Sequence, residues 1–346
     1  MITKILKKIK RKKVIDKIKS AKITGKGGAG FPTWLKWKRV EKAKGDIKYV
    51  ICNASEGEPG VKKDLYILKH FPETVFKGMI IAMDYLNTNQ AYFNFNKDYY
   101  SQVRQKIDAL VKKYKRKGYN FTVFQEEPSY IGGERSALLN AIEGKPTEPR
   151  LKPPSPSVVG LFGKPTLIHN VETLFDIALS IEGKYENMRF YTILGKVKNP
   201  GVYYLPLIWS VEKILYNTKN LPSFDFFVQI GGGASGEVIN KKQAKTMAAS
   251  GCGSIEVYSS NTKPKDLFLK WFEFFKNESC GKCTPCREGT YQLYNLVKAR
   301  ENVPYSDILE ITNLMKKTSF CGLGESVRVP VESYIKNILK KQILNI

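Results

Sequence analysis

The stretch Tyr49-Val50-Ile51-Cys52 decides the fold class, because similar apolar runs follow it at regular intervals along the chain. Ala91-Tyr92-Phe93-Asn94-Phe95 and Phe121-Thr122-Val123-Phe124 also have the pattern of short strands. Residues 72–87 and 99–117, which separate these runs, have the pattern of helices. This alternation of strand and helix predicts an α/β layer fold.

Three further segments flank this core. Residues 2–20 have the pattern of an amphipathic helix with apolar residues among lysines, and a glycine-rich loop spans Gly25 to Gly30. The segment from Pro146 to Pro165 contains six prolines, so we expect a stiff, extended loop rather than regular structure.

The second half of the chain changes character twice. Residues 185–258 contain short strand-like pieces at Arg189–Leu194, Gly201–Leu205 and Phe226–Ile230 and a helix near 210–216, which suggests a small β-grasp-like domain. From Lys265 onward the pattern is helical. Apolar residues recur at three- and four-residue spacing in segments 265–277, 287–299, 305–317 and 326–344, which fits a four-helix bundle. We therefore predict domains at residues 1–184, 185–258 and 259–346.

Composition limits the classes of function. The chain of 346 residues is 42% apolar and long enough for two or three domains with a buried core. It contains no run of about 18 apolar residues, so we predict no membrane span. Lys and Arg interrupt the N-terminal apolar residues, which argues against a signal peptide and for the cytoplasm. No helix-turn-helix, RRM or zinc-finger pattern supports binding to nucleic acid.

The net charge of +25 has two interpretations. Residues 1–22 contain ten Lys or Arg and one acid, Asp16. This segment is either a solvated basic helix in a lysine-rich proteome or a docking element for an acidic partner, such as an acidic ferredoxin or a sister subunit.

Four of the six cysteines predict a metal cluster. Cys280, Cys283 and Cys286 form a Cys-x2-Cys-x2-Cys motif, and Cys321 lies in the loop between the last two predicted helices. Three thiolates on one tight loop can hold three corners of a [4Fe–4S] cluster, and Cys321 can supply the fourth ligand. Zinc sites usually use paired Cys-x2-Cys units, so the even spacing favours iron–sulfur. Cys52 and Cys252 are interpreted as core residues.

The glycine loop indicates a ligand site less specifically. Gly25-Lys26-Gly27-Gly28-Ala29-Gly30 fits G-x-G-x-x-G, but a helix-like segment precedes it and Phe31-Pro32 stands where a Rossmann helix should start. Four glycines in six residues let backbone amides approach an anionic or aromatic ligand. Lys26 and Lys36 can provide charge for a phosphate, and Phe31 can stack on a flat ring. A plain flexible loop is the alternative.

The two motifs together point to a family. The sequence resembles the flavin-binding, NADH-oxidising subunit of respiratory complex I and related subunits of NAD-linked hydrogenases and formate dehydrogenases. The resemblance covers nearly the whole chain. Beyond the glycine loop and the cysteine motif, it rests on Cys52-Asn53-Ala54 with Glu56, Glu58-Pro59-Gly60 and Asp64, on Tyr130-Ile131-Gly132-Gly133-Glu134, on Arg150-Leu151-Lys152-Pro153-Pro154, on Gly163-Lys164-Pro165-Thr166, and on Asn170-Val171-Glu172-Thr173.

The resemblance implies a flavin domain, a ubiquitin-like domain and a four-helix cluster domain. It also implies FMN, a [4Fe–4S] cluster and NADH or NADPH as cofactors, with the flavin splitting an electron pair for the one-electron cluster. Residues that match the family's flavin positions are Gly27, Gly28, Lys36, Asn53, Glu56, Gly133 and Asn170. Glu58, as the catalytic residue, and Phe31 would face the nicotinamide nucleotide. Further cofactor-binding positions are Gly25, Lys26, Ala29, Gly30, Tyr130, Glu134, Arg135, Lys152 and His169.

Several positions depart from the family pattern. Ser55 and Gly57 stand where the family has Asp and Ser, and His169 replaces the first Asn of an Asn-Asn pair. Arg39 and Ser155 replace two aromatic residues that hold the adenine in the family. The cation of Arg39 can compensate in part by stacking on adenine.

Arg135 replaces the second acid of the family's Gly-Glu-Glu. An acid there would bond the ribose hydroxyls, whereas an Arg attracts a 2′-phosphate, so we predict a preference shifted toward NADPH.

The leading hypothesis is an NAD(P)H-oxidising subunit that passes single electrons to a thioredoxin-like [2Fe–2S] subunit and to further iron–sulfur or catalytic subunits. The alternative is a flavin and iron–sulfur relay, or a ferredoxin-coupled module, that no longer uses a nicotinamide nucleotide. A third class, a basic iron–sulfur protein bound to nucleic acid, leaves the flavin-loop motifs unexplained.

Overall fold

The computed structural model describes residues 11–340, and by internal contacts the chain divides into two compact units. The first unit contains residues up to Gly57 and residues 62–188, and the second contains residues 189 onward together with Glu58–Val61. The second unit thus includes a short piece of chain that lies, in sequence, inside the first. The predicted division into three domains stays a prediction.

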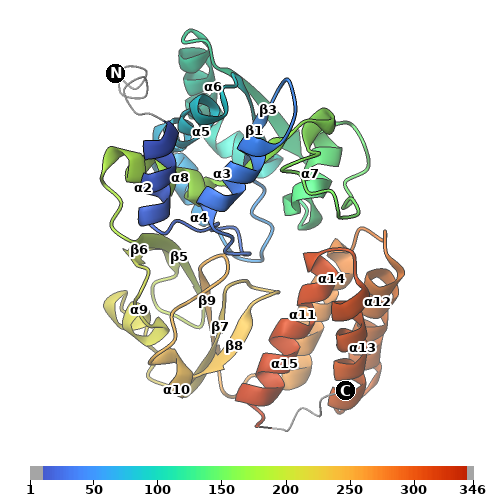
Figure 1. Ribbon diagram of the computed structural model, residues 1–346. Helices are drawn as coiled ribbons and strands as arrows, with labels where there is room; N and C mark the ends of the chain where they lie inside the picture. The colour runs from blue at the N-terminus through green and yellow to red at the C-terminus, as the bar shows by residue number, and fades with distance from the viewer. Residues whose placement is uncertain (1–10, 341–346) are drawn as a thin grey trace. The chain divides into compact units, whose positions relative to one another are not determined.

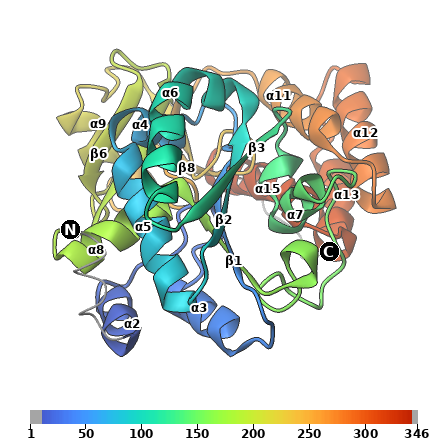
Figure 2. The same cartoon turned by 90° about the horizontal axis from the view of Figure 1, so that it is seen from above.

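The first unit is a parallel α/β sheet with helices on both faces (Figure 2). Its elements in chain order are α2 (Arg11–Ser20), α3 (Thr33–Lys42), β1 (Tyr49–Ala54), α4 (Lys63–His70), α5 (Pro72–Leu86), β2 (Gln90–Asn96), α6 (Lys97–Lys115), β3 (Asn120–Glu126), α7 (Arg135–Ile142), β4 (Thr166–Asn170) and α8 (Val171–Glu182), with single 3-10 turns at Ile131–Gly133 and Leu161–Gly163.

The strand order in this sheet is β3-β2-β1-β4, and every neighbouring pair is parallel. The order runs outward from β1 to β2 and β3 and then returns to the opposite side of β1 for β4. Such a reversal opens a crevice at the carboxyl ends of the two strands between which the order reverses, which is where open α/β sheets bind ligands. In this unit those strands are β1 and β4.

Alternation along the strands places residues on opposite faces of the sheet. Ile51 of β1 and Ile168 of β4 pack with Leu138 and Leu139 of α7 in one buried cluster. Figure 2 shows α7 on one side of the strands and α5 and α6 on the other. The odd-numbered residues of β1, Asn53 among them, therefore share the α7 face.

The second unit begins with a five-stranded mixed sheet of order β6-β5-β9-β7-β8. β5 pairs with β9 in parallel, whereas β7 is antiparallel to both β8 and β9. Val211, Ile214 and Leu215 of α9 pack into its apolar core. The elements are β5 (Met188–Gly195), β6 (Gly201–Pro206), α9 (Val211–Asn217), β7 (Phe226–Ile230), β8 (Glu237–Asn240), α10 (Lys241–Ala244) and β9 (Ser254–Ser259).

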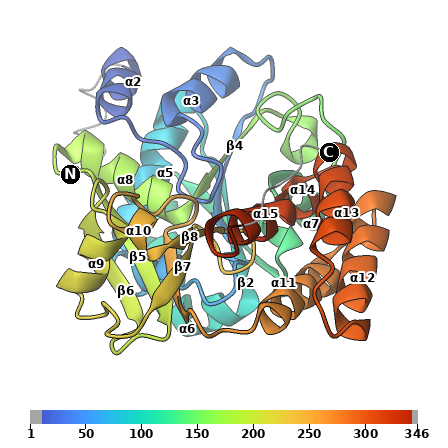
Figure 3. The same ribbon diagram turned by 90° about the horizontal axis from the view of Figure 1, so that it is seen from below.

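Helices form the rest of this unit and lie together as a group (Figures 1 and 3). Their core includes Phe268, Trp271 and Phe272, all fully buried. The helices are α11 (Pro264–Glu278), α12 (Thr284–Ala299), α13 (Tyr305–Thr318), α14 (Gly322–Ser326) and α15 (Arg328–Asn337). Within residues 11–340, no helix is both long enough and apolar enough to cross a membrane.

The sequence predicted no element at α3, α4, α7, α8, β4, β8 or β9, and the elements that it did predict are present with the differences that follow. The helix predicted over residues 2–20 is present as α2, and residues 2–10 lie outside the described chain. The last predicted helix, 326–344, ends earlier, at Asn337, and a separate short helix, α14, precedes it. A helix does follow the glycine loop, because α3 begins at Thr33 directly after Pro32. The element before the loop is still a helix, so the loop is not a Rossmann turn.

Candidate flavin and cluster sites

Three asparagines line up at the carboxyl ends of neighbouring strands. Asn53 near the end of β1 is opposite Asn94 of β2 on one side and opposite Asn170 of β4 on the other. Parallel pairing in register brings residues far apart in sequence to one edge of the sheet. This edge is the crevice that the strand order opens, and most of the predicted flavin residues lie at it.

The glycine loop closes back on itself and packs against this edge. The amide of Gly25 donates to the carbonyl of Phe31 over 2.9 Å. A Cβ atom on Gly27 would lie 3.2 Å from the Cβ of Asn170, so the loop approaches β4 more closely than a residue with a side chain comfortably allows. Gly28 and Gly30 have φ angles of +118° and +60°, a region that glycine adopts without strain. The loop is therefore a shaped cradle.

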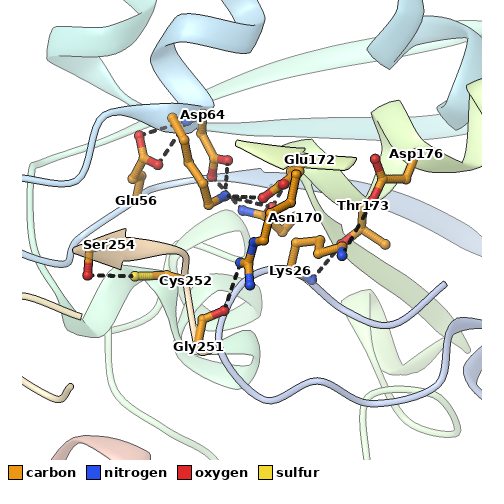
Figure 4. Close-up of polar contacts among 12 residues, drawn as sticks. Lys26, Glu56, Asp64, Asn170, Glu172, Thr173, Asp176, Gly251, Cys252 and Ser254 are labelled. Carbon is orange, nitrogen blue, oxygen red and sulfur yellow. Dashed lines mark hydrogen bonds and ion pairs between the residues drawn. The ribbon is translucent and has the colours of Figure 1, made fainter. Parts of the chain in front are cut away.

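The charged side chain of Lys26 lies in the interior of the first unit. Its side chain is buried, and its Nζ lies 3.9 Å from the carboxylate of Asp176, which is also buried. Its backbone amide donates to Thr173 Oγ1 over 2.9 Å (Figure 4). In this structure the charge of Lys26 is paired with Asp176, and its predicted role of supplying charge for a phosphate stays a prediction. The loop is anchored to α8 by both contacts.

A buried ionic network lies behind Asn170 (Figure 4). Lys63 donates to Asp64 over 2.5 Å, and its Nζ lies 3.3 Å from Glu172. Asn170 donates its amide hydrogen to Asp64 and accepts from the backbone amide of Glu172 over 3.0 Å. The oxygen and one hydrogen of the Asn170 amide are therefore engaged with the protein itself, which ties the end of β4 to α4 and α8, and its predicted cofactor-binding role stays a prediction.

Glu56 completes this network. Its carboxylate accepts from the backbone amide of Asp64 at the start of α4 over 2.8 and 3.0 Å. Its φ of +41° is in the left-handed region, which is strained for a residue with a side chain. Burial, and then the charge of Asp64, raise the pKa of Glu56 to about 8. Three carboxylates around the single ammonium of Lys63 cannot all ionise freely, and Glu56 is the one that retains its proton to near-neutral pH.

The part of the site between α3 and the start of α7 is electropositive, because it contains the cations of Lys36 and Arg135. Burial, and then the neighbouring charge of Arg135, lower the pKa of Lys36 to about 8. The Lys36 ammonium donates to the carbonyl of Ile168 over 3.0 Å. Arg135 is the first residue of α7 and is exposed, and it forms no ion pair with any residue in 11–340. Two cations this close together suit an anionic ligand such as a phosphate.

His169 is a neutral residue in this part of the site. The indole Nε1 of Trp37 donates to His169 Nε2 over 2.8 Å, so the ring proton must be on Nδ1. Burial lowers the pKa of His169 well below its usual value, and Lys36 and Arg135 lower it further. His169 is 2% exposed, and its Nδ1 has no hydrogen-bond partner within the described chain. Where the family has an amide, this chain thus has a neutral ring with one fixed donor.

Glu134 and Lys152, both predicted to bind a cofactor, pair with each other over 2.7 Å. Glu134 also caps α7, since it accepts from the amides of Ser136 and Ala137. The Lys152 bond and the other hydrogen bonds lower the pKa of Glu134 despite its burial. The backbone of Tyr130 passes close to Gly57, where a Cβ atom would lie 2.7 Å from the Tyr130 Cα. That approach accounts for glycine where the family has serine.

Phe31 is also engaged within the first unit. The guanidinium of Arg39 lies over its ring, with 4.8 Å between Cζ and the ring centroid. Arg39 was predicted to compensate for a lost aromatic by stacking on adenine. Here it stacks on the residue that was predicted to meet the nucleotide.

Glu58 belongs to the second unit, where a glycine-rich turn holds its carboxylate. The amide of Ala234 donates to Glu58 Oε2 over 3.1 Å, and the hydroxyl of Ser235 donates to Oε1. A Cβ atom on Gly232 would lie 2.6 Å from the carboxylate carbon, so a larger residue there would displace the Glu58 carboxylate from its present position. Its predicted catalytic role stays a prediction.

The cluster cysteines lie at the starts of two helices in the second unit. Cys283 is the N-cap of α12, and Cys286 is in its first turn. Cys321 is the residue that precedes α14. The N-terminus of a long helix such as α12 favours a thiolate. Cys283, Cys286 and Cys321 are buried and Cys280 is exposed.

The thiols of the other three cysteines are close enough to Cys286 to affect its pKa. Burial, together with the charges of Cys283, Cys321 and Cys280, raises the pKa of Cys286 to about 12, although the Ser279 hydroxyl 3.4 Å away opposes them. Four thiolates near enough to repel one another need a metal centre to stabilise them, because the metal charge offsets both the burial and the repulsion. The arrangement therefore suits the ligand set of a metal cluster.

Comparison with known proteins matches two separate family models, one to the part of the chain with the glycine loop and one to the part with the four cysteines. Residues 18–179 match the model of the Nuo51 FMN-binding domain, and residues 266–341 match the NADH-ubiquinone oxidoreductase-F iron–sulfur binding region. The second F-type subunit of NADH-quinone oxidoreductase from Rhizobium meliloti is 32% identical over 373 residues, which cover 96% of this chain and 88% of the relative. The chain belongs to the family of F-type subunits of NADH-quinone oxidoreductase.

Another relative and two solved structures are also similar to this chain over most of its length. The F-type subunit from Aquifex aeolicus is 32% identical over 90% of this chain and 80% of its own. A crystal structure of NAD+-reducing [NiFe]-hydrogenase in the H2-reduced state superposes with a TM-score of 0.86 at 26% identity, covering 97% of this chain. The air-oxidized state gives 0.88 at 27% identity. The chain spans 64% and 66% of those two hydrogenase chains.

Membership of this family confirms the predicted resemblance and two of the predicted cofactors, FMN and the [4Fe–4S] cluster. All four cluster cysteines lie within the matched iron–sulfur region, and the glycine loop and the asparagines lie within the matched FMN-binding domain. Cys52 and Cys252 are buried, as predicted for core residues. Cys252 lies 4.0 Å from the Ser254 hydroxyl in the second unit (Figure 4).

Sequence reasoning missed several residues that build the flavin site. Lys63, Glu172 and Asp176 carry its buried charges, and Asn94 and Glu126 lie beside Asn53 at the ends of β2 and β3. Asp64 and Glu172 occurred in the motifs that carry the resemblance, yet received no role. The available signal for Asn94 was its place as a polar residue inside the apolar run 91–95.

Proposed function

We propose that this chain oxidises a reduced nicotinamide nucleotide and passes single electrons to partner subunits. FMN, when bound, accepts an electron pair and releases electrons singly to a one-electron centre. The observation that carries the proposal is the crevice at the ends of β1 and β4, where the glycine cradle, the Asn53 amide and the cations of Lys36 and Arg135 meet. The names of its relatives, which include quinone oxidoreductases and an NAD+-reducing hydrogenase, support the same chemistry.

The roles of individual residues follow from their contacts. The cradle of Gly27 and Gly28 admits a ligand close to the backbone, and Lys36 and His169 offer donors on the electropositive side. The buried network of Glu56, Lys63 and Asp64 holds the loop after β1 in its strained conformation. The four thiolates of Cys280, Cys283, Cys286 and Cys321 hold the [4Fe–4S] cluster.

The first test of the function is direct reduction of the flavin. The holoprotein is mixed anaerobically with NADH or NADPH, and bleaching of the visible flavin band is followed. Bleaching with either nucleotide supports the proposal. A flavin that neither nucleotide reduces would sink it.

We further propose a preference for NADPH, which rests on Arg135. Its guanidinium is exposed, adds to the positive charge around Lys36, and forms no ion pair within the described part of the chain. A charge-assisted bond to a 2′-phosphate is worth about 1.5–3 kcal/mol. Arg135→Glu should therefore weaken NADPH binding roughly tenfold or more while NADH binding holds or improves. Equal affinities for the two nucleotides in both proteins would contradict this preference.

A relay that uses no nicotinamide is the second candidate, and two contacts favour it. The Phe31 ring is covered by Arg39, and the Glu58 carboxylate is bonded to Ala234 and Ser235. Both residues were assigned to the nucleotide. If neither nucleotide bleaches the flavin but a reduced ferredoxin does, the relay is the function.

The architecture supports a place in a larger complex. The strand order β6-β5-β9-β7-β8 with α9 packed on it supports a ubiquitin-like (β-grasp) domain, and α11, α12, α13 and α15 support a four-helix cluster domain. We propose that electrons leave through a thioredoxin-like [2Fe–2S] subunit to further iron–sulfur or catalytic subunits. An acidic ferredoxin is the alternative partner for so basic a chain. Identification of the copurifying subunits tests this assignment.

A further inference from the structure

Side chains at the ends of β1 and β2 form hydrogen bonds that run in one direction. Asn94 Nδ2 donates to Ser55 Oγ over 2.9 Å, and Ser55 Oγ donates to Asn53 Oδ1 over 2.8 Å. An amide nitrogen can only donate, so the Ser55 hydroxyl must accept from Asn94 and send its own hydrogen to Asn53. Asn94 and Ser55 are buried, at 0% and 1% exposure, so water does not compete for these bonds.

These bonds leave the Asn53 side chain one free polar group. Its Oδ1 also accepts from the Ser55 backbone amide over 3.2 Å, which fills both acceptor positions. Its Nδ2 donates one hydrogen to the carbonyl of Gly133 over 2.9 Å. What remains is the second Nδ2 hydrogen. A flipped amide would set oxygen against the Gly133 carbonyl and lose both bonds from Ser55, so the orientation is fixed.

Glu126, the last residue of β3, lies close enough to the side chains of both Ser55 and Asn94 for them to affect its pKa. It is 7% exposed, and burial raises its pKa although Ser55 and Asn94 lower it. Neither Glu126 oxygen nor Asn94 Oδ1 has a hydrogen-bond partner among residues 11–340. All three are acceptors, so a proton on Glu126 supplies the missing donor for Asn94. That bond would hold the Asn94 amide with its nitrogen toward Ser55.

We propose that Glu126, Asn94 and Ser55 are positioning residues that fix the Asn53 amide as a hydrogen-bond donor to an acceptor atom of the flavin. The inference rests on the proposed function, in which Asn53 lies at the flavin. It goes beyond that function because it assigns a direction to the bond and adds two residues, Asn94 and Glu126, that the family motifs do not include. Ser55 stands where the family has Asp, so this series of hydrogen bonds is a feature of this chain rather than of the family pattern.

Asn94→Asp is the sharpest test. A carboxylate at 94 cannot donate a hydrogen bond, so the Ser55 hydroxyl turns its hydrogen toward that carboxylate. Asn53 Oδ1 then loses the hydrogen bond from Ser55 Oγ that fixes the orientation of its amide. We expect the dissociation constant for FMN, measured by fluorescence titration of the deflavinated protein, to rise roughly three- to tenfold. The visible spectrum of the bound flavin should shift as well. An Asn94→Asp protein with wild-type affinity and spectrum overturns the inference.

Asn96→Asp is the matched control. Asn96 lies on the same strand two residues further on, and its side chain caps α6 by accepting from the Asp98 amide over 2.9 Å. Aspartate is an equally good cap, so the affinity for FMN and the spectrum should stay at wild-type values. If Asn96→Asp changes FMN binding as much as Asn94→Asp does, the effect is one of charge and the inference is wrong.

Three further variants test the inference if Asn94→Asp fails to fold. Ser55→Ala removes the same hydrogen bond to Asn53 Oδ1 without adding charge, and it should weaken FMN binding to a similar extent. Glu126→Leu should weaken it too, whereas Glu126→Gln keeps a donor for Asn94 and should bind FMN as the wild type does. Equal binding by both Glu126 variants overturns the role of Glu126. A wild-type protein that binds FMN but is not reduced by either nucleotide ends the proposed function and leaves this inference standing.

Discussion

The flavin site and the cluster site are built in opposite ways. Three of the four cluster cysteines lie within seven residues of sequence, at the start of a single helix. The flavin site gathers side chains from the ends of parallel strands and from the loops that follow them, over more than one hundred residues of chain. The cluster site depends on one kind of ligand, whereas the flavin site depends on a balance of buried charges. A local site should fail when one ligand is removed, and a distributed site should fail when its charge balance is disturbed.

The largest effect is expected from Cys286→Ser in the cluster site. Loss of one thiolate from a four-cysteine set should abolish the cluster, because a serine hydroxyl is a far poorer ligand for iron than a thiolate. Iron content and the EPR signal of the reduced protein should both fall to background. Cys252→Ser changes a buried thiol outside the motif and serves as the control, which should retain about four iron atoms per chain. Full iron content in Cys286→Ser would contradict the ligand assignment.

Lys63→Met tests the charge balance of the flavin site. Lys63 is 1% exposed and is the ammonium nearest to Asp64 and Glu172, so its loss leaves carboxylates buried without a partner. Removing one partner of a buried ion pair typically costs about 3–5 kcal/mol. Denaturant unfolding should show this loss in the free energy of unfolding. Lys77→Met, which breaks the half-exposed pair with Glu182, should cost less than about 1 kcal/mol.

The pH dependence of stability should reveal Glu56. Its folded-state pKa of about 8 is above the usual value, so the folded state binds this proton more tightly than the unfolded state does. The contribution to stability is therefore complete below about pH 4.5 and is lost as the pH rises toward 8. A rise in pKa from 4.5 to about 8 corresponds to a loss on the order of 5 kcal/mol. Glu56→Gln should flatten the slope of unfolding free energy against pH over this range, and an unchanged slope would assign the proton elsewhere.

The smallest effect concerns Lys36 and binding. Burial and Arg135 lower the pKa of Lys36 to about 8, so its ammonium loses its proton in a range where an ordinary lysine stays charged. Affinity for a phosphate-bearing ligand should therefore fall by up to about tenfold per pH unit above 8. FMN and riboflavin should be titrated side by side, because riboflavin lacks the phosphate. Lys36→Arg should remove the pH dependence for FMN, since guanidinium stays charged.

The sequence by itself determined the elements and the local chemistry. Apolar runs such as 49–52 and 91–95 predicted β1 and β2, and the spacing of Cys280, Cys283 and Cys286 predicted the cluster. These features could be read because strand and helix periodicity and ligand spacing are properties of neighbouring residues. The glycine loop was also visible, but the sequence did not predict that Lys26 turns its charge toward Asp176.

Only the tertiary structure decided how the flavin site is charged and oriented. The register of β1 with β2 and β4 sets Asn53 between Asn94 and Asn170, and no pattern within any one strand contains that pairing. The protonation of Glu56 and the tautomer of His169 follow from burial and from partners that are distant in sequence. Desolvation and the Coulomb interaction depend on distance in space, so these properties arise only once the chain has folded.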